Sequence, residues 1–149
     1  MYFPVDGRSR LNPPLPKGYF GNVIFIAAVV TQAEPFTETL KRIHERLKKI
    51  NDEYLRSALD YIKQVSDLIS TLARGPHTFR CPNLAINSWM LLPIYDADFG
   101  WGRPVYMGPE NVIQEGKIVI LPSPTNDGSS SVVTCLETSH VKLFEKFLY

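Results

Sequence analysis

The spacing of hydrophobic residues changes along this chain, and each spacing predicts a different secondary structure. Residues 22–30 form an almost unbroken apolar run of strand length, and residues 1–5 predict another strand. A run without polar alternation is typical of a strand buried on both faces. From about residue 36 to residue 73, apolar positions instead recur every three to four residues, which is the spacing of amphipathic helices.

This middle part predicts two helices. The first has a basic side and an apolar side, and Thr37 or Thr39 is its expected cap. Its apolar residues are Phe36, Leu40, Ile43, Leu47 and Ile50. The second runs from about residue 52 to residue 73 and ends before Gly75-Pro76, because proline cannot continue a helix.

A strand pattern returns after Cys81. Strands are predicted at 85–91, 104–107, 117–121 and 131–136. The sequence PTNDG at 124–128 predicts a hairpin turn, because Asp-Gly tolerates positive φ. A last helix over about 141–148 is expected, capped by Thr138 or Ser139. This order of elements predicts a mixed α/β layered domain.

Composition narrows the possible functions. The chain has 149 residues, enough for one domain, and a net charge of +1, which predicts no nucleic-acid partner. It has no apolar run of transmembrane length and no basic amphipathic segment for a membrane surface, so no membrane partner is expected. Cys81 and Cys135 lie far apart in the sequence, which favours free thiols and a cytoplasmic protein.

General chemical motifs are missing from the sequence. It contains no HExxH, CxxC, P-loop or GxSxG, so neither a metal site nor a catalytic residue is predicted. The three histidines are His44, His77 and His140, and a surface, loop or capping role is expected for each. From residue chemistry alone, the prediction stops at an α/β domain.

Several segments in order resemble a known family. DFGWGRP at 98–104 resembles the signature of the BAHD acyltransferases, plant enzymes that use acyl-CoA donors. DGRSRL at 6–11 and GYFGN at 18–22 resemble other segments of that family. The runs RGPHTFRCPNLAINSW (74–89) and LPSPTNDGS (121–129) resemble the hydroxycinnamoyltransferases that act on shikimate or quinate. The resemblance covers nearly the whole chain.

The resemblance implies a fold and a domain. The fold would be the chloramphenicol-acetyltransferase-like two-layer sandwich, with residues 1–149 forming one C-terminal domain of a mixed sheet flanked by helices. The family's HxxxD motif belongs to the N-terminal domain, and no HxxxD occurs here: Lys48 follows His44 by four places, and Cys81 follows His77 by four. An N-terminal HxxxD domain or fragment is therefore the expected partner, and the isolated chain is expected to be inactive.

The resemblance also implies a reaction. A hydroxycinnamoyl group such as p-coumaroyl would pass from a coenzyme A thioester to the hydroxyl of shikimate or quinate, in phenylpropanoid, lignin or chlorogenic acid biosynthesis. Coenzyme A is then a co-substrate, and no tightly bound cofactor is expected. A hydroxyl needs a general base at neutral pH, which the HxxxD histidine would supply. This chain would orient the acceptor.

Three residues are predicted to bind the acceptor. The resemblance implies that Arg74 holds the acceptor carboxylate, which a guanidinium binds bidentately. The alternative is an arginine that neutralises the end of a helix. Asn87 and Trp89 lie in the segment that lines the acceptor pocket in similar enzymes, where threonine is common at the Asn87 position. For Trp89 the alternative is an ordinary core aromatic residue.

A second set is predicted to be structural. In the family, the motif's aspartate pairs with an upstream arginine, which here predicts Asp98 with Arg8 or Arg10. Gly100 and Gly102, on either side of Trp101, are expected to permit close backbone approach near the coenzyme A channel. A loop cluster of Arg8, Arg10 and Lys17 either contacts coenzyme A phosphates or is simply solvated.

Two other functions are compatible with the sequence. The chain is either part of the acyltransferase or a truncated, non-catalytic binding or interaction module, which the missing HxxxD motif favours. An amine acceptor is a further alternative, although Arg74 would repel a cationic one. A companion chain with HxxxD that restores acyl transfer would separate the first two.

Overall fold

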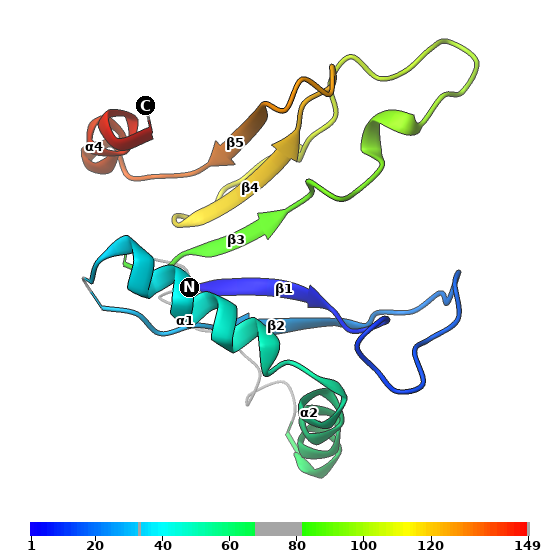
Figure 1. The fold of residues 1–149 in the computed structure, drawn as a ribbon. Coiled ribbons are helices and arrows are strands. Elements are labelled where there is room, and N and C mark those ends of the chain that lie inside the picture. The colour runs from blue at the N-terminus through cyan, green and yellow to red at the C-terminus, as the bar shows by residue number, and fades with distance from the viewer. Residues whose placement is uncertain (33, 68–81, 149) are drawn as a thin grey trace. The chain divides into compact units, whose positions relative to one another are not determined.

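A pair of antiparallel strands begins the fold. The computed structural model describes residues 1–32, 34–67 and 82–148, in two units of residues 1–75 and 76–149 that are treated separately. In the first unit, β1 (Tyr2–Asp6) pairs with β2 (Ile24–Ala28), and Phe3 lies opposite Ala27 (Figure 1). The two predicted strands are therefore confirmed, with the second shorter than expected.

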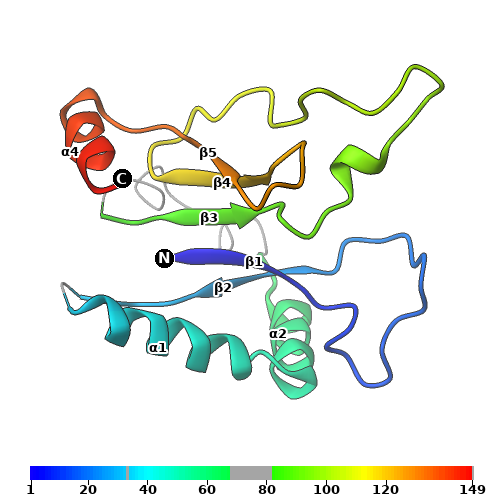
Figure 2. The same ribbon diagram turned by 45° about the horizontal axis from the view of Figure 1, so that its top comes forward.

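Two helices pack on one face of this strand pair. They are α1 (Phe36–Lys48) and α2 (Asp52–Gln64). Ile50 between them and Leu55 in α2 form a buried cluster with Val5 and Ala27 from the strands. Figure 2 shows α1 running along one side of the strand pair. The apolar spacing that predicted these helices thus supplies the core of the first unit.

The opposite face of the strand pair has no cover among the described residues. Ile24 is 48% exposed and Ile26 is 42% exposed, whereas Ala27, at an alternate position of the same strand, is buried. The prediction of a strand buried on both faces is therefore wrong for these residues. Alternate side chains of a strand point to opposite faces, and the helices cover only one of them.

Two other features of the first unit differ from the predictions. The second predicted helix ends at Gln64, where Val65 turns extended with ψ of 115°. Residues 68–73 of that prediction lie outside the described residues. The residue before α1 is Pro35, and neither Thr37 nor Thr39 caps the helix; α2 is capped by Asn51, whose side chain accepts a hydrogen bond from the Tyr54 amide at 3.0 Å.

A mixed three-stranded arrangement forms the second unit. β4 (Lys117–Pro122) pairs parallel with β3 (Ala85–Ser88) and antiparallel with β5 (Ser130–Thr134). A short 3₁₀ turn, η2 (Ile94–Asp96), follows β3, and the chain ends in α4 (Thr138–Leu148). The order of elements confirms the predicted mixed α/β class. Because α4 begins at Thr138, Thr138 and Ser139 lie inside its first turn, not before it.

The predicted strand at 104–107 is wrong. Val105 is 89% exposed, and no β-ladder includes this segment. The amide of Met107 donates instead to the Tyr95 hydroxyl oxygen at 3.4 Å. The residue types favour a strand, but a strand also needs a neighbouring strand to satisfy its backbone, and none pairs here among the described residues.

The hairpin predicted at 124–128 is confirmed. It joins β4 to β5, with φ of 53° at Asn126 and 83° at Gly128. Ser129 donates from its hydroxyl and its amide to the Asp127 carboxylate, and the Thr125 hydroxyl donates as well. These hydrogen bonds, those from Ser129 first, hold the pKa of Asp127 well below its ordinary value. Their stabilisation is therefore present above about pH 4 and is lost as the pH falls through the folded-state pKa.

No helix among the described residues is both long and apolar enough to cross a lipid bilayer. Cys135 is a half-buried free thiol, as predicted. Cys81 lies outside the described residues.

The buried position of Leu55 yields a stability prediction. Leu55→Ala is expected to lower the free energy of unfolding by about 3 kcal/mol, because it removes a fully buried side chain and leaves a cavity. Leu59→Ala is the matched control on the same helix, since Leu59 is 41% exposed and Leu55 is 0% exposed. Urea unfolding measures both. Equal losses would contradict the core described above.

Candidate functional site

Asn87 and Trp89 are placed by strand β3. In the parallel ladder with β4, Asn87 lies opposite Val119, and the Trp89 amide donates to the Ile120 carbonyl oxygen at 2.8 Å. Residues two apart on a strand share a face, and residues opposite in a ladder do so as well. Asn87 and Trp89 are both half-buried. Asn87 therefore lies on the sheet face of Val119, which is buried, and Trp89 directly follows the strand.

The third predicted acceptor residue, Arg74, lies outside the described residues, as does His77. The role of Arg74 in holding a carboxylate stays a prediction.

The glycine-rich loop at 98–102 is organised by one carboxylate oxygen. Asp98 Oδ1 accepts hydrogen bonds from the amides of Gly100 at 2.8 Å and Gly102 at 3.1 Å. An aspartate that bonds nearby amides in this way closes a local turn. These bonds are local to the loop, and the prediction that Asp98 is structural and not catalytic stays a prediction.

The two glycines of this loop are needed for their backbone conformation. Gly100 has φ of 97° and Gly102 has φ of 96°, a region that side chains with a Cβ rarely adopt. A Cβ at either position would meet no described atom within 4 Å. Close approach of this backbone near a coenzyme A channel stays a prediction. Trp101 between them is 93% exposed.

Arg8 and Arg10 bind backbone and side chains within the first unit. Arg8 donates to the Asp6 carboxylate at 3.0 Å and to the Gly21 carbonyl oxygen at 2.7 Å. Arg10 donates to the carbonyl oxygens of Leu47 at 3.1 Å and Ile50 at 2.9 Å, at the end of α1. Both arginines therefore stabilise the loop that follows β1. A pair between either one and Asp98 stays a prediction.

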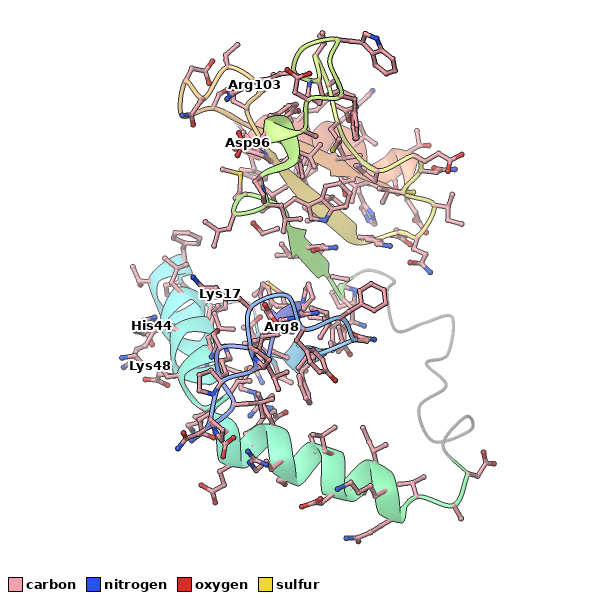
Figure 3. All side chains as sticks on the ribbon, turned by 90° about the vertical axis from the view of Figure 1, so that its right-hand side faces the viewer. Arg8, Lys17, His44, Lys48, Asp96 and Arg103 are labelled. Carbon is pink, nitrogen blue, oxygen red and sulfur yellow. The ribbon has the colours of Figure 1, made fainter. Side chains whose placement is uncertain are left out.

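Of the predicted cluster of Arg8, Arg10 and Lys17, only Lys17 has the exposure expected of a solvated side chain. Lys17 is exposed on the loop that contains Arg8, while the donors of Arg8 have the partners just given (Figure 3). His44 and Lys48 lie on the outer side of α1 in the same view, and His44 is exposed. The same view labels Asp96, at the end of η2, and Arg103, just after the glycine-rich loop, which form a long ion pair of 3.9 Å.

A cluster that the sequence analysis did not predict lies in the second unit. Glu115, Glu137 and His140 each offer one ligand atom, and these atoms all lie within 4.8 Å of one another. Glu137 and His140 form a Glu-x-x-His sequence, and this signal was available in the sequence. Glu115 comes from a distant loop, so only the fold brings it to the other two.

Comparisons with known proteins agree with one another. A family model described as the Transferase family matches residues 1–149. Shikimate O-hydroxycinnamoyltransferase of Nicotiana tabacum is 54% identical over 154 residues, which cover all of this chain and 35% of that protein. Hydroxycinnamoyl-CoA:5-hydroxyanthranilate N-hydroxycinnamoyltransferase of Avena sativa is 50% identical over 152 residues, covering 99% of this chain and 34% of that protein.

A solved structure shows the same fold. TRI101 of F. sporotrichioides, complexed with coenzyme A and T-2, superposes with a TM-score of 0.75 at 18% identity, covering 97% of this chain and 37% of that one. This match confirms the predicted chloramphenicol-acetyltransferase-like fold class. The present chain spans about a third of the length of the relatives it matches.

The role of Asp98 can be tested with two substitutions. Asp98→Ala is expected to lower stability by about 1–2 kcal/mol, because two backbone amides lose their acceptor. Asp98→Asn is expected to cost less than half as much, because a single side-chain oxygen accepts both hydrogen bonds.

Thermal unfolding of the complete protein measures both effects, with Asp96→Asn, at the end of the neighbouring η2, as the control. If Asp98 instead pairs with Arg8 or Arg10, the Asn and Ala variants will be equally unstable, and the local-turn role is wrong.

Proposed function

Since this chain belongs to the Transferase family, the BAHD acyltransferases, we propose that it forms the acceptor-orienting part of an acyl-CoA-dependent hydroxycinnamoyltransferase. The complete enzyme transfers a hydroxycinnamoyl group, such as p-coumaroyl, from a coenzyme A thioester to the hydroxyl of shikimate or quinate. The observation that carries this proposal is the 54% identity, over the whole chain, with a shikimate O-hydroxycinnamoyltransferase. A cytoplasmic location and a place in phenylpropanoid metabolism belong to the same proposal.

The reaction requires groups that this sequence does not contain. The acceptor hydroxyl attacks the thioester carbonyl, and a general base must remove the hydroxyl proton at neutral pH. The tetrahedral intermediate needs hydrogen-bond donors, and the thiol of coenzyme A then leaves. No HxxxD occurs in the sequence. The base therefore belongs to the portion of the enzyme that corresponds to the remaining two thirds of the relatives.

The contribution of this chain is to position the acceptor. Asn87 on β3 offers both a donor and an acceptor of hydrogen bonds, and Trp89, directly after the strand, offers an apolar surface. Arg74 supplies the positive charge for a carboxylate. Fixing the hydroxyl against the thioester removes much of the entropic cost of a reaction between two molecules.

A shared feature of the relatives' acceptors supports the role of Arg74. The tobacco relative is named for shikimate and the oat relative for 5-hydroxyanthranilate. The first is acylated on oxygen and the second on nitrogen, but both acceptors are carboxylates. A guanidinium that binds the carboxylate serves either acceptor, and the choice between oxygen and nitrogen then depends on other pocket residues such as Asn87.

The uncovered strand face supports the proposal of an HxxxD-bearing partner portion. Ile24 and Ile26 expose adjacent apolar side chains on β2, on the face opposite the helices. Exposed apolar patches on sheets mark contact surfaces. The sequence of β2 is apolar on both faces, which is expected of a strand that is covered on both sides in the complete enzyme.

The acceptor role can be tested by steady-state kinetics. Arg74→Ala in the complete enzyme is expected to raise the KM for shikimate or quinate at least tenfold, because a charge-assisted hydrogen-bonded pair is lost. The KM for the acyl-CoA should change less than twofold.

Arg56→Ala is the control for that experiment, since Arg56 is an exposed arginine on α2 that pairs with Asp52 at 2.9 Å. Equal effects of Arg74→Ala on both substrates would contradict the carboxylate role. A complete protein that transfers no acyl group to any acid would favour the non-catalytic binding module.

The contact surface is tested with a charge on β2. Ile26→Lys is expected to weaken association of this chain with the HxxxD portion, or to destabilise the joined enzyme, by about 2–3 kcal/mol, because it places a charge in an apolar interface. Leu59→Lys is the matched control, with 41% exposure against 42% for Ile26. Thermal unfolding and sedimentation measure the two variants. An Ile26→Lys variant no weaker than the control would exclude this face.

A further inference from the structure

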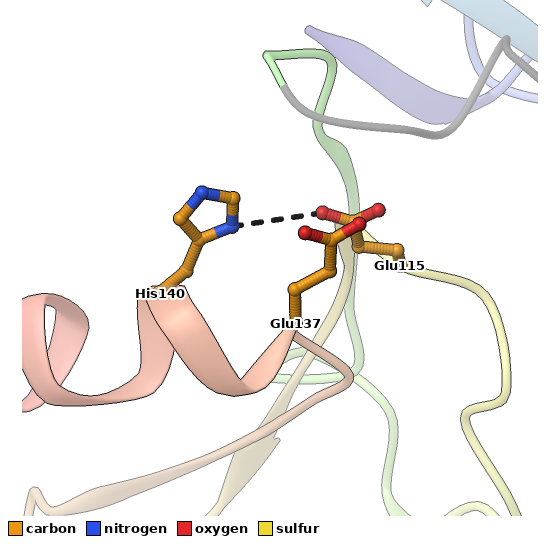
Figure 4. Close-up of side chains that lie close together, drawn as sticks. All are labelled: Glu115, Glu137 and His140. Atoms are coloured by element: carbon orange, nitrogen blue, oxygen red, sulfur yellow. Dashed lines mark ion pairs between the residues drawn. The ribbon is translucent and has the colours of Figure 1, made fainter.

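Two separate segments bring metal-ligating side chains together in the second unit. Glu115 lies in the loop just before β4, Glu137 just before α4, and His140 in the first turn of α4 (Figure 4). Their ligand atoms all lie within 4.8 Å of one another. All three belong to residues 82–148, so the arrangement does not depend on the first unit.

The spacing between these atoms is close to that of a metal site. Zinc binds histidine nitrogen and carboxylate oxygen at about 2.1 Å, which places tetrahedral ligands roughly 3.4 Å apart. His140 Nδ1 and Glu115 Oε1 are already 3.7 Å apart. The carboxylate of Glu137 points toward the same space in Figure 4. All three ligand atoms lie within 4.8 Å of one another, so a common ion would have to draw them closer together by side-chain rotation.

Glu137 and His140 are brought together at the start of α4. Glu137 directly precedes the helix and His140 lies in its first turn. The His140 amide donates to the Glu137 carbonyl oxygen at 2.8 Å, which closes the turn between them. Both side chains therefore lie near Glu115.

Glu115 supplies an independent observation. Its Oε1 atom is buried and accepts no hydrogen bond. A buried carboxylate oxygen without a donor is unfavourable. The ion pair with His140 Nδ1, at 3.7 Å, is too long to be a hydrogen bond. A bound cation would satisfy this oxygen.

The three side chains differ in their access to solvent. Glu115 and His140 border an open groove of about 370 Å³, whose other lining residues are mostly apolar, including Leu136, Leu143 and Phe144. The Glu115 side chain is only 16% exposed, whereas that of His140 is 41% exposed and Glu137 is exposed. An ion from solvent can therefore reach all three side chains.

We propose that Glu115, Glu137 and His140 form a binding site for one divalent transition-metal ion, best matched by Zn²⁺, which ties the start of α4 to the loop before β4. One imidazole and two carboxylates suit zinc better than magnesium or calcium, which prefer oxygen alone. Three protein ligands leave a fourth position for water. The site is structural and is independent of the acyl-transfer proposal.

Metal analysis of the complete transferase tests this site with Zn²⁺ as the probe. After chelation, reloading and dialysis, one equivalent of zinc per chain is expected at this site. Removing a ligand should raise the Kd for zinc at least about 100-fold. That is the largest effect expected from losing a residue that only hydrogen-bonds to a metal ligand. The variants are Glu115→Gln, Glu137→Gln and His140→Ala. Glu137 is exposed, so its substitution should leave folding intact even if Glu115→Gln does not fold.

Matched controls are His44→Ala and Glu145→Gln, both at exposed helix positions. They should bind zinc as the unmodified protein does, and Co²⁺ loaded in place of zinc should show d–d absorption that Glu137→Gln and His140→Ala lose. A chelator should lower the Tm of the unmodified protein and not that of His140→Ala. Absence of bound zinc, or an unchanged Kd in Glu137→Gln and His140→Ala, would overturn the proposal and leave a simple Glu115–His140 ion pair.

Discussion

Backbone pairing on both edges of β4 is the constraint on which the second unit depends. β4 binds β3 in parallel along one edge and β5 antiparallel along the other. The register with β3 places Asn87 opposite Val119, and so decides the sheet face on which Asn87 lies. The hairpin to β5 directs the chain toward α4, while Glu115 is held just before β4. A shift of one residue in either ladder would turn these side chains to the opposite face.

The first unit depends on burial of one face of a strand pair. Ile50 and Leu55, at the junction of the two helices, complete the core with Val5 and Ala27. Arg10 adds hydrogen bonds to the end of α1, where carbonyl oxygens lack partners within the helix. The other face of β2 is equally apolar in composition yet exposed. One face of the strand pair is therefore buried under the helices, and the other is an exposed apolar surface. This is consistent with a chain that spans about a third of the length of its relatives.

The DFGWGRP segment at 98–104 forms a local hydrogen-bonded turn in this chain. One oxygen of Asp98 binds two amides, and glycines supply the positive φ angles that the turn requires. Both features are local to this loop. Asn87 and Trp89, two of the residues proposed to meet the acceptor, lie elsewhere in the second unit, on β3 and directly after it.

The sequence by itself determined the kinds of elements, the hairpin at 124–128 and the family. Local spacing and turn residues such as Asp127-Gly128 carry that information, because they act within a few positions of the chain. It did not reveal that 104–107 lacks a strand partner, that the second face of β2 is uncovered, or that Glu115 meets His140. Only tertiary structure decided these, because each depends on which distant segment packs alongside, and a residue's own type and neighbours do not encode the position of that segment.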